Sequence, residues 1–381
     1  MIKIVTAKRL NRFPEYVFSK LGKMVKEVEE KSGKKVLNFG PGTPDVRPSD
    51  HYIKKLHEFI DEKNSHMYPG YGAIPELSSA LINWYKRRFK VKIKEDELLP
   101  LLGAKDGVSH MPLALCDSGD EVLIPDPGYP GYVGPTLMVG AKTVFYDLSM
   151  EDKNPFIDLE RKITKKTKYI WVNFPSNPTG EVATLKDLKK IVQIAKKKRV
   201  LIIYDNAYSE IAFDGFTTPS ILQVPGAKDI AVEIGSYSKM SSFAGLRMGW
   251  IAGNKEIISA LSKIKSQIDS GLSIPLQKIG AYCLDNPDEK WTHNMIKSYE
   301  DRRNIIASKL EKLGLRFTLP KGSLYIWAKI PDSEKDSESY SFKLLKERNI
   351  LLTPGTAFGK NGKRHVRVSI CINIDKINEY V

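Results

Sequence analysis

The feature that most constrains the fold is a regular alternation of short apolar segments with amphipathic helical segments between about residues 75 and 285. Six segments are typical of strands, several of them apolar on both faces: "EVLIP", "KTVFY", "KYIWVNF", "VLIIYD", "IAVEIGSYS" and "LRMGWIAG". The stretch "TLKDLKKIVQIAKKKR" places Leu188, Ile191 and Val192 on one stripe, with Thr184 as its predicted N-cap. Buried strands that alternate with amphipathic helices indicate an α/β fold, with a mostly parallel sheet covered by helices on both sides.

From about residue 288 the pattern changes. A long charged helix, "KWTHNMIKSYEDRRNIIASKLEKLG", precedes a strand, "SLYIWAKI", which is followed by another helix and two short strands. This order suits a smaller α+β domain. We expect the large domain to span residues 48–287 and the small domain to combine residues 1–47 and 288–381.

The net charge of +15 is compatible with nucleic-acid or membrane binding, but the distribution of lysines argues against both. Lysines are spread along the whole chain, and the short run "AKKKR" at 195–199 lies at the end of an amphipathic helix, where solvated charges are usual. No apolar run approaches the length needed to cross a bilayer. The first residues also lack the uninterrupted apolar core of a secretory signal. We therefore expect neither a nucleic-acid nor a membrane partner.

The three cysteines, Cys116, Cys283 and Cys371, are odd in number and widely spaced. No CxxC pair and no HExxH sequence is present, so neither a disulfide framework nor a metal site is indicated. A reducing cytoplasm is the expected location.

Polar motifs follow the predicted strands, which is where open parallel sheets bind their ligands. "NFPSNPTG" follows "KYIWV", "DNAYSE" follows "VLIIY", "SYSK" follows "IAVEIG", and "DPGYPGY" follows "DEVLIP". A fifth motif, "GAKDG", stands at the start of a predicted helix. Each motif alone is compatible with an ordinary turn or helix cap, so only their order and spacing together are informative.

Together these motifs resemble the class I/II aminotransferases, which are pyridoxal-phosphate enzymes of fold type I. The resemblance runs from about Asn38 to Ser369, and its most specific pieces are "SNPTG", "YDNAY" and "SYSKMSSFAGLRMGW". It implies a large domain with a mostly parallel seven-stranded sheet between helices, and a smaller α+β domain. It also implies a homodimer in which each subunit helps to complete the other's site.

The resemblance assigns roles around the cofactor ring. Pyridoxal phosphate forms an imine with an amino acid and withdraws electrons from its α-carbon. Lys239 matches the Schiff-base lysine, whose amine also moves the proton once it is released. Asp205 matches the carboxylate that keeps the ring nitrogen protonated. Asn177 and Tyr208 match the groups that hydrogen-bond the phenolic oxygen, and we also expect Tyr208 to assist catalysis and Asn177 to contact the substrate.

A second group of residues matches the family's phosphate site. Ser236 and Arg247 correspond to its serine and arginine, and the helix that opens at Ala104 and Lys105 can offer backbone N–H groups to the same dianion. Tyr68, in "YPGYGAIPEL", matches a tyrosine that reaches the phosphate across the dimer interface.

The remaining assignments concern the ring face and the substrate. Tyr129 matches the aromatic residue that stacks on the cofactor, with Tyr132 as the alternative. Arg367, in "GKRHVRVSI", stands at the position that binds the substrate α-carboxylate, a task suited to a planar two-donor group. Arg364 is its rival and is expected to be solvated. Gly42, in "NFGPGTPD", matches a glycine whose backbone approaches the same carboxylate.

Other reactions on the same scaffold remain alternatives. A C–S lyase or another β-eliminating enzyme would have the same lysine, aspartate and phosphate site, whereas Arg367 disfavours a decarboxylase because it retains the carboxylate. A regulatory protein with an aminotransferase-like domain would carry a separate DNA-binding module. A nicotinamide-binding Rossmann enzyme would need the third glycine that "GPGTPD" lacks. We therefore predict transamination by a ping-pong mechanism.

The substrate is less constrained. The "GAKDG" and "DPGYPGY" loops resemble the branch that contains alanine, aspartate and LL-diaminopimelate aminotransferases. In some aspartate-using relatives a lysine at the position of Lys105 faces the distal carboxylate. An acidic donor or alanine is therefore expected, with a 2-oxo acid such as 2-oxoglutarate as acceptor. Two backbone expectations complete the list: cis peptides before Pro127 and Pro178, and a kink or late start in the helix that contains Pro112.

Overall fold

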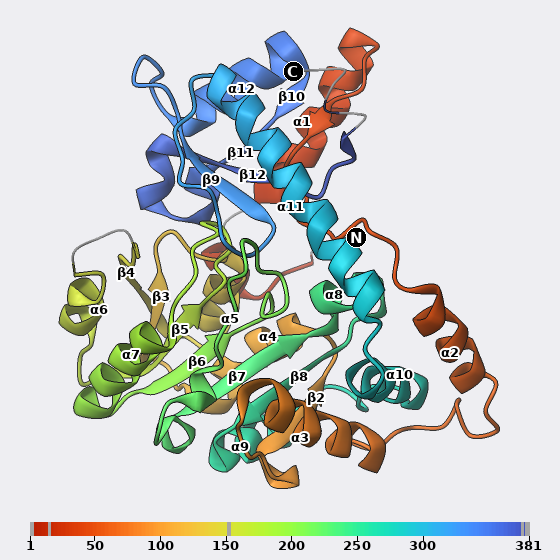
Figure 1. Ribbon diagram of the computed structural model, residues 1–381. Helices are drawn as coiled ribbons and strands as arrows, with labels where there is room; N and C mark the ends of the chain where they lie inside the picture. The colour runs from red at the N-terminus through yellow and green to blue at the C-terminus, as the bar shows by residue number, and fades with distance from the viewer. Residues whose placement is uncertain (1–3, 14–16, 151–153, 375–376, 378–381) are drawn as a thin grey trace.

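The computed structural model describes residues 4–13, 17–150, 154–374 and 377, and its centre is a seven-stranded sheet (Figure 1). The strand order is β2-β8-β7-β6-β5-β3-β4, and β8 alone among them runs antiparallel to its neighbours. The strands are β2 (Leu98–Leu101), β3 (Glu121–Pro125), β4 (Lys142–Tyr146), β5 (Thr167–Asn173), β6 (Leu201–Asp205), β7 (Ala231–Ser236) and β8 (Gly249–Gly253). The predicted fold class is confirmed, while the exact domain boundaries stay a prediction.

Helices cover both faces of this sheet, and each face has its own apolar core. Successive residues of one strand point to opposite faces, so Ile203 belongs to one core and Tyr204 to the other. The first face carries α4 (Ala104–Leu115), α5 (Val133–Met138) and α9 (Lys255–Lys265). The second carries α2 (Asp50–Ile60), α3 (Pro75–Phe89), α6 (Ile157–Lys162), α7 (Leu185–Lys198) and α10 (Ile274–Asp285).

Local sequence explains several helix ends. The predicted N-cap Thr184 is confirmed: its hydroxyl accepts a hydrogen bond from the backbone N–H of Asp187. The Asp187 carboxylate accepts one from Thr184 N–H in return, which forms a capping box. Pro75 occupies the first turn of α3. The expectation for Pro112 was wrong with regard to a late start, because α4 runs from Ala104 to Leu115 with Pro112 inside it. Pro112 has no N–H to donate to the carbonyl of Val108, so one intrahelical hydrogen bond is missing within α4.

The small domain is built around a three-stranded antiparallel sheet in the order β11-β12-β9. Its elements are α11 (Glu289–Lys312), β9 (Tyr325–Lys329), α12 (Ser337–Arg348), β10 (Ile350–Leu351), β11 (Thr353–Pro354) and β12 (His365–Ser369). Near the amino terminus, α1 (Val17–Ser32) is followed by β1 (Leu37–Asn38), which pairs in parallel with β10. Helix α11 runs from the large domain to the small one (Figure 1).

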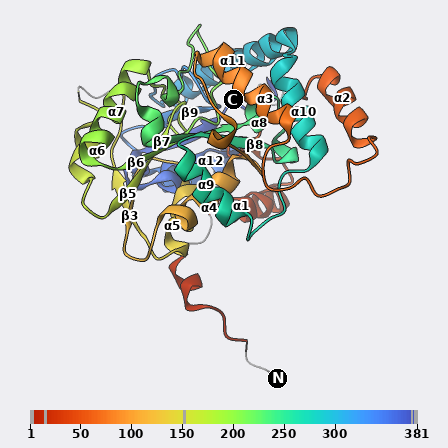
Figure 2. The ribbon, with the colours of Figure 1, turned by 90° about the horizontal axis from the view of Figure 1, so that it is seen from below.

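Short segments connect these elements. They are η1 (Lys8–Arg12), η2 (Glu95–Glu97), η3 (Pro130–Tyr132), η4 (Ile221–Gln223), η5 (Ala227–Asp229), α8 (Tyr237–Met240), η6 (Ala244–Leu246), η7 (Gly355–Phe358) and η8 (Lys360–Arg364). The segment with η1 extends away from the rest of the molecule (Figure 2). Among the residues that the structure describes, no helix combines the length and the apolar character needed to cross a membrane.

The two domains share side chains next to the end of β6. Tyr208, Ile211 and Phe213 follow this strand of the large sheet, yet they pack in the core of the small domain. The carboxyl ends of the central strands therefore lie against the small domain, which is the position expected for a ligand site in an open α/β sheet.

Candidate active site

A cavity of about 430 Å³ lies at the carboxyl ends of β5, β6 and β7, beside the first turn of α4. Thr43 and Tyr325, which belong to segments of the small domain, also line it. Nine of the residues predicted to form the site line this cavity: Ala104, Lys105, Tyr129, Asn177, Asp205, Tyr208, Ser236, Lys239 and Arg247. The structure thus gathers them from five separate stretches of the chain.

Lys239 lies in α8, directly after β7. Its Nζ donates a hydrogen bond to the carbonyl oxygen of Gly42 at 3.0 Å and lies 5.5 Å from the centre of the Tyr208 ring. Burial lowers the pKa of Lys239 to about 8, because the charged ammonium is poorly solvated there. An appreciable fraction of this amine is therefore neutral near physiological pH, which is the form that attacks a carbonyl carbon.

Asp205 ends β6 and is buried. Its Oδ2 accepts a hydrogen bond from the Tyr132 hydroxyl at 2.7 Å, and its Oδ1 accepts one from the backbone N–H of Ala207 at 3.3 Å. Burial raises the pKa of Asp205, and these two hydrogen bonds oppose that shift. The Tyr132 ring is stacked on Trp171, with ring centres 4.4 Å apart. Tyr129 thus lines the cavity, whereas Tyr132 holds the carboxylate from behind.

Donors for an anion gather at one end of the cavity, where the hydroxyl residues Ser236 and Ser238, Arg247 and the first turn of α4 meet. Gly103 precedes α4 with φ +78°, and a Cβ atom there would lie 2.7 Å from Nη2 of Arg247. A side chain at residue 103 would therefore strain the backbone and displace the guanidinium group, so glycine suits this turn. A cation, hydroxyl groups and a helix N-terminus at one place form a site suited to a phosphate.

Arg367, on β12, is buried behind Asn177 and Tyr325, two residues that line the cavity. Its Nη1 donates to Oδ1 of Asn177 at 2.9 Å, and its Nη2 donates to the carbonyl oxygen of Gly40 at 2.6 Å. The guanidinium carbon lies 4.1 Å from the centre of the Tyr325 ring and 4.5 Å from that of Phe358. These contacts fix a planar cation in one orientation, which suits two-point binding of a carboxylate.

The backbone of Gly42 packs against Tyr325, which also contacts Arg367. A Cβ atom on Gly42 would lie 1.8 Å from the hydroxyl oxygen of Tyr325, so no larger residue fits. The Tyr325 hydroxyl in turn lies 3.1 Å from that of Tyr208. The carbonyl of Gly42, the amine of Lys239 and the two tyrosines therefore form one packed group.

Two other predictions are placed outside the cavity. Tyr68 is 86% exposed and does not line it. Arg364 is not simply solvated as expected, because its guanidinium group donates to the carbonyl oxygens of Pro331 (2.8 Å) and Glu334. Arg364 thus fixes a loop of the small domain, and Arg367 is the arginine that contacts the cavity-lining residues Asn177 and Tyr325. The predicted cis peptides before Pro127 and Pro178 are confirmed, and a third precedes Pro175.

The model of the family "Aminotransferase class I and II" matches residues 34–381. The chain is a class I and II aminotransferase. This aminotransferase is 37% identical to an LL-diaminopimelate aminotransferase of Gloeobacter violaceus, over 99% of this chain and 96% of that one. It is 35% identical to the LL-diaminopimelate aminotransferase of Natranaerobius thermophilus, over 98% and 96% of the two chains.

Solved structures resemble the aminotransferase over its whole length. The substrate-bound structure of BacF from Bacillus subtilis matches with a TM-score of 0.92 at 32% identity and covers 99% of this chain and 96% of its own. An aspartate aminotransferase from Thermotoga maritima matches with a TM-score of 0.89 at 28% identity, over 98% and 97%.

The aminotransferase uses pyridoxal 5'-phosphate as its cofactor. The cavity fits this group. A Cβ atom on Gly249 would lie 2.9 Å from the backbone nitrogen of Ala104, so the glycine lets β8 pass directly beneath the α4 N-terminus, where a phosphate is expected. A buried carboxylate, Asp205, and an amine of lowered pKa, Lys239, line the same cavity, and their chemistry suits a protonated ring nitrogen and a carbonyl group respectively.

Sequence reasoning missed three residues of the aminotransferase site. Ser238 lines the anion end of the cavity, and its backbone N–H donates to Oγ of Ser236 at 3.2 Å. Tyr325 joins Gly42, Tyr208 and Arg367, but its segment "SLYIWAKI" indicated only a strand. Tyr132 was considered only as a ring-stacking residue. Its position in "DPGYPGY" was the available signal, yet its bond to Asp205 required the fold.

Proposed function

We propose that this aminotransferase transfers the amino group of LL-diaminopimelate to a 2-oxo acid such as 2-oxoglutarate by a ping-pong mechanism. The observation that carries the proposal is that relatives named LL-diaminopimelate aminotransferases match 98–99% of the chain at 33–37% identity. When bound, pyridoxal phosphate supplies a carbonyl that condenses with amines and a ring that withdraws electrons from the α-carbon. The chain supplies binding, orientation and proton transfer.

Five side chains are proposed to act at the ring. Lys239 holds the cofactor, and its released amine then carries the proton to and from the substrate α-carbon. Asp205 faces the ring nitrogen with a negative charge that keeps this nitrogen protonated. Tyr208 and Asn177 donate to the phenolic oxygen, and Tyr129 stacks on the ring.

The anion sites orient the other ends of cofactor and substrate. Ser236, Arg247 and the backbone of Ala104 and Lys105 are proposed to hold the phosphate. Arg367 and the backbone of Gly42 hold the substrate α-carboxylate, which brings the α-carbon next to Lys239. Fixing both ends of the substrate excludes unproductive orientations.

Lys105 helps to distinguish between the candidate amino donors. It lines the cavity, and LL-diaminopimelate carries a second carboxylate that a lysine at this position can meet. Aspartate and glutamate also carry a distal carboxylate, so acidic donors are the second candidates, and alanine, which has none, would not use Lys105. Substitution of Lys105 therefore separates dicarboxylic donors from alanine.

We also propose a cytoplasmic homodimer. Tyr68 is assigned to the partner's phosphate site, and its surroundings support an interface because Met67 and Tyr71 in the same loop are also exposed.

The test is the visible absorption spectrum of the purified enzyme with pyridoxal phosphate, before and after addition of single donors. We expect a band that depends on Lys239, disappears with LL-diaminopimelate and returns with 2-oxoglutarate. L-glutamate, L-aspartate and L-alanine are tested in parallel, and the Lys239→Ala variant is the control that should give no such band. A band converted by another donor alone would overturn the assigned substrate, and release of ammonia without conversion of the band would indicate a β-eliminating enzyme.

A further inference from the structure

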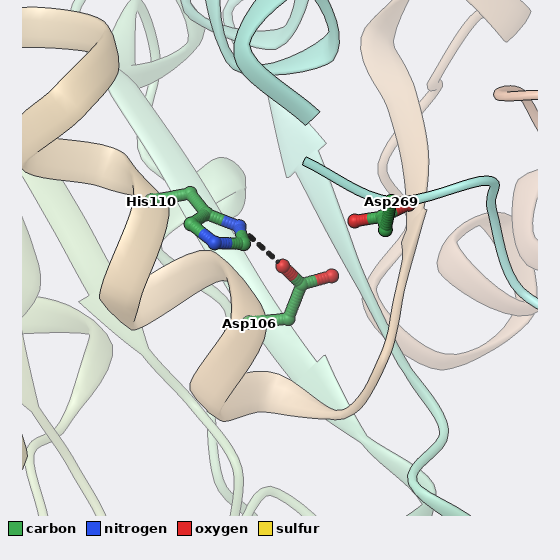
Figure 3. A group of neighbouring side chains, drawn as sticks. All are labelled: Asp106, His110 and Asp269. Atoms are coloured by element: carbon green, nitrogen blue, oxygen red, sulfur yellow. Dashed lines mark ion pairs between the residues drawn. The ribbon is translucent and has the colours of Figure 1, made fainter. Parts of the chain in front are cut away.

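A buried ion cluster lies behind the phosphate end of the cavity. Lys265, in the last turn of α9, has a side chain only 3% exposed, and its Nζ contacts a carboxylate on either side. It donates to Oδ2 of Asp106 on α4 and to Oδ2 of Asp269 in the loop after α9, the latter at 2.7 Å. Nδ1 of His110 lies 2.6 Å from Oδ1 of Asp106. Figure 3 shows Asp106 and His110 side by side on α4, with Asp269 facing them from the other segment.

The two carboxylates and the imidazole offer atoms within 4.8 Å of one another, which is also the composition of a metal site. The Lys265 ammonium bonds both carboxylates, however, so a positive charge already stands between them. The cluster is therefore an ion-pair bridge between two parts of the chain.

One end of the bridge fixes the turn before α4. Oδ2 of Asp106 also accepts a hydrogen bond from the backbone N–H of Leu102 at 2.8 Å, across the turn that contains Gly103. This turn leads directly into Ala104 and Lys105, whose backbone N–H groups are proposed to hold the phosphate. The Asp106 carboxylate thus sets the direction of those donors, and Lys265 neutralises the carboxylate.

The other end of the bridge reaches the loop that presents Tyr68. Oδ1 of Asp269 accepts a hydrogen bond from the backbone N–H of Gly271 at 2.8 Å. Gly271 has φ +89°, and a Cβ atom there would lie 2.0 Å from the carbonyl oxygen of Gly70. The backbone at Gly271 therefore packs directly on Gly70, two residues after Tyr68.

We propose that Lys265 is a positioning residue that holds both protein elements of the phosphate site: the first turn of α4 in its own subunit and the Tyr68 loop offered to the partner subunit. The second half rests on the proposed homodimer. One buried ammonium group would thereby link the geometry of the two cofactor sites.

Loss of the ammonium would act on phosphate binding in two ways. Asp106 and Asp269 would be left buried without their cation, and the Asp106 carboxylate, which holds the turn before α4, would lose a group that fixes its position. The charge beside the α4 N-terminus would also become more negative by one unit, which opposes binding of a phosphate dianion there. Binding of a cofactor that carries the phosphate should therefore suffer more than binding of one that lacks it.

The experiment compares Lys265→Met with Lys228→Met in the full-length enzyme. Lys228 is a matched control, because its partly buried Nζ bonds Glu97 at 2.6 Å in a segment that does not line the cavity. Apoenzyme is titrated with pyridoxal phosphate and, separately, with pyridoxal, and the visible band gives each dissociation constant. For Lys265→Met we expect pyridoxal phosphate to bind about tenfold more weakly, with pyridoxal unchanged. Lys228→Met should alter neither.

Equal weakening for both ligands, or no weakening for either, would overturn the proposal. If Lys265→Met does not fold, Asp269→Asn replaces it, since this variant keeps an acceptor for Gly271 and loses only the charge facing Lys265. The effects of Asp269→Asn and Tyr68→Phe on the dissociation constant of pyridoxal phosphate should be less than additive in the double variant, because both changes act on one loop. Strict additivity would contradict the proposed link between Lys265 and the Tyr68 loop. A wild-type enzyme without any band would instead refute the proposed function, so the two failures are distinguishable.

Discussion

The two faces of the large sheet each bury a carboxylate, and the two make an instructive pair. Asp205 ends β6, and Glu233 lies in the adjacent strand β7, where it pairs with Tyr204. Side chains of paired residues point to the same face, so Asp205 lies on the α4 face and Glu233 on the α3 face. Each accepts a hydrogen bond from a buried tyrosine: Tyr132 at 2.7 Å for Asp205, and Tyr85 at 3.0 Å for Glu233.

The two carboxylates differ in whether they are accessible from the cavity. Asp205 lines the cavity together with Lys239. Glu233 is enclosed by three donors, the hydroxyls of Tyr85 and Ser220 and the backbone N–H of Ile221. Burial raises the pKa of both carboxyl groups, to about 7 for Glu233. A buried carboxylate with a raised pKa is therefore not in itself an indication of catalysis; a cavity with converging partners is what separates the two.

The largest expected difference between the two carboxylates is in the loss of kcat when each is replaced by its amide. Asp205→Asn keeps the shape and removes the charge that we propose faces the ring nitrogen, so we expect kcat to fall about 10²–10³-fold. Glu233→Gln makes the same chemical change on the other face and should leave kcat within about twofold, since it lies outside the cavity. Steady-state kinetics of both variants with one donor and 2-oxoglutarate measure the contrast.

Thermal unfolding of each variant controls for loss of fold. If kcat falls comparably for Glu233→Gln while the fold stays intact, a carboxylate outside the cavity also affects turnover, and the contrast between the two faces of the sheet is wrong.

The sequence allowed one of these carboxylates to be identified and not the other. Asp205 stands in "YDNAY", a motif whose resemblance to a family predicted a role for it at the cofactor ring. Glu233 stands in "IAVEIGSYS", which indicated only a strand, and its partner Tyr85 lies 148 positions away in the chain. Contacts of this kind depend on which helix covers which face, and a single sequence does not contain that information.

The second contrast, smaller in effect, concerns the two tyrosines. Tyr132→Phe removes one hydrogen bond to the Asp205 carboxylate, so the pKa of Asp205 should rise further. We expect kcat/KM to fall about tenfold, as for loss of a hydrogen bond to a charged group. The acid limb of its pH profile should move to higher pH. Tyr85→Phe should leave the profile unchanged and lower the melting temperature, because Trp250 Nε1 donates to the Tyr85 hydroxyl at 3.2 Å and would lose that acceptor.

The pH profile distinguishes positioning from simple destabilisation. A lower kcat/KM for Tyr132→Phe with an unshifted acid limb would show that Tyr132 acts only through packing.

The fold was more predictable than these contacts, for physical reasons. The strands β3 and β4 and the helix α7 coincide with the segments predicted from periodicity, because each is bounded by clear turn or capping residues. The edge strand β2 (Leu98–Leu101) was not identified, since it is short and contains Pro100. It is held by pairing with β8, which follows it by about 150 residues.

The smallest expected effect is a change in the free energy of unfolding with pH, which results from the burial of Glu233. With a pKa of about 7 in the folded protein and an ordinary value of 4.5, Glu233 binds more protons in the folded state than in the unfolded state between these two values. The free energy of unfolding should therefore fall as the pH rises from about 4.5 to 7, by up to about 3 kcal/mol from this group.

Glu233→Gln removes the titration, and its amide can still pair with the hydroxyl groups of Tyr85 and Ser220. We expect the variant to gain melting temperature over the wild type by roughly a few degrees more at pH 8 than at pH 5. Equal differences at the two pH values would mean that Glu233 titrates normally, and that the three donors around it compensate fully for its burial.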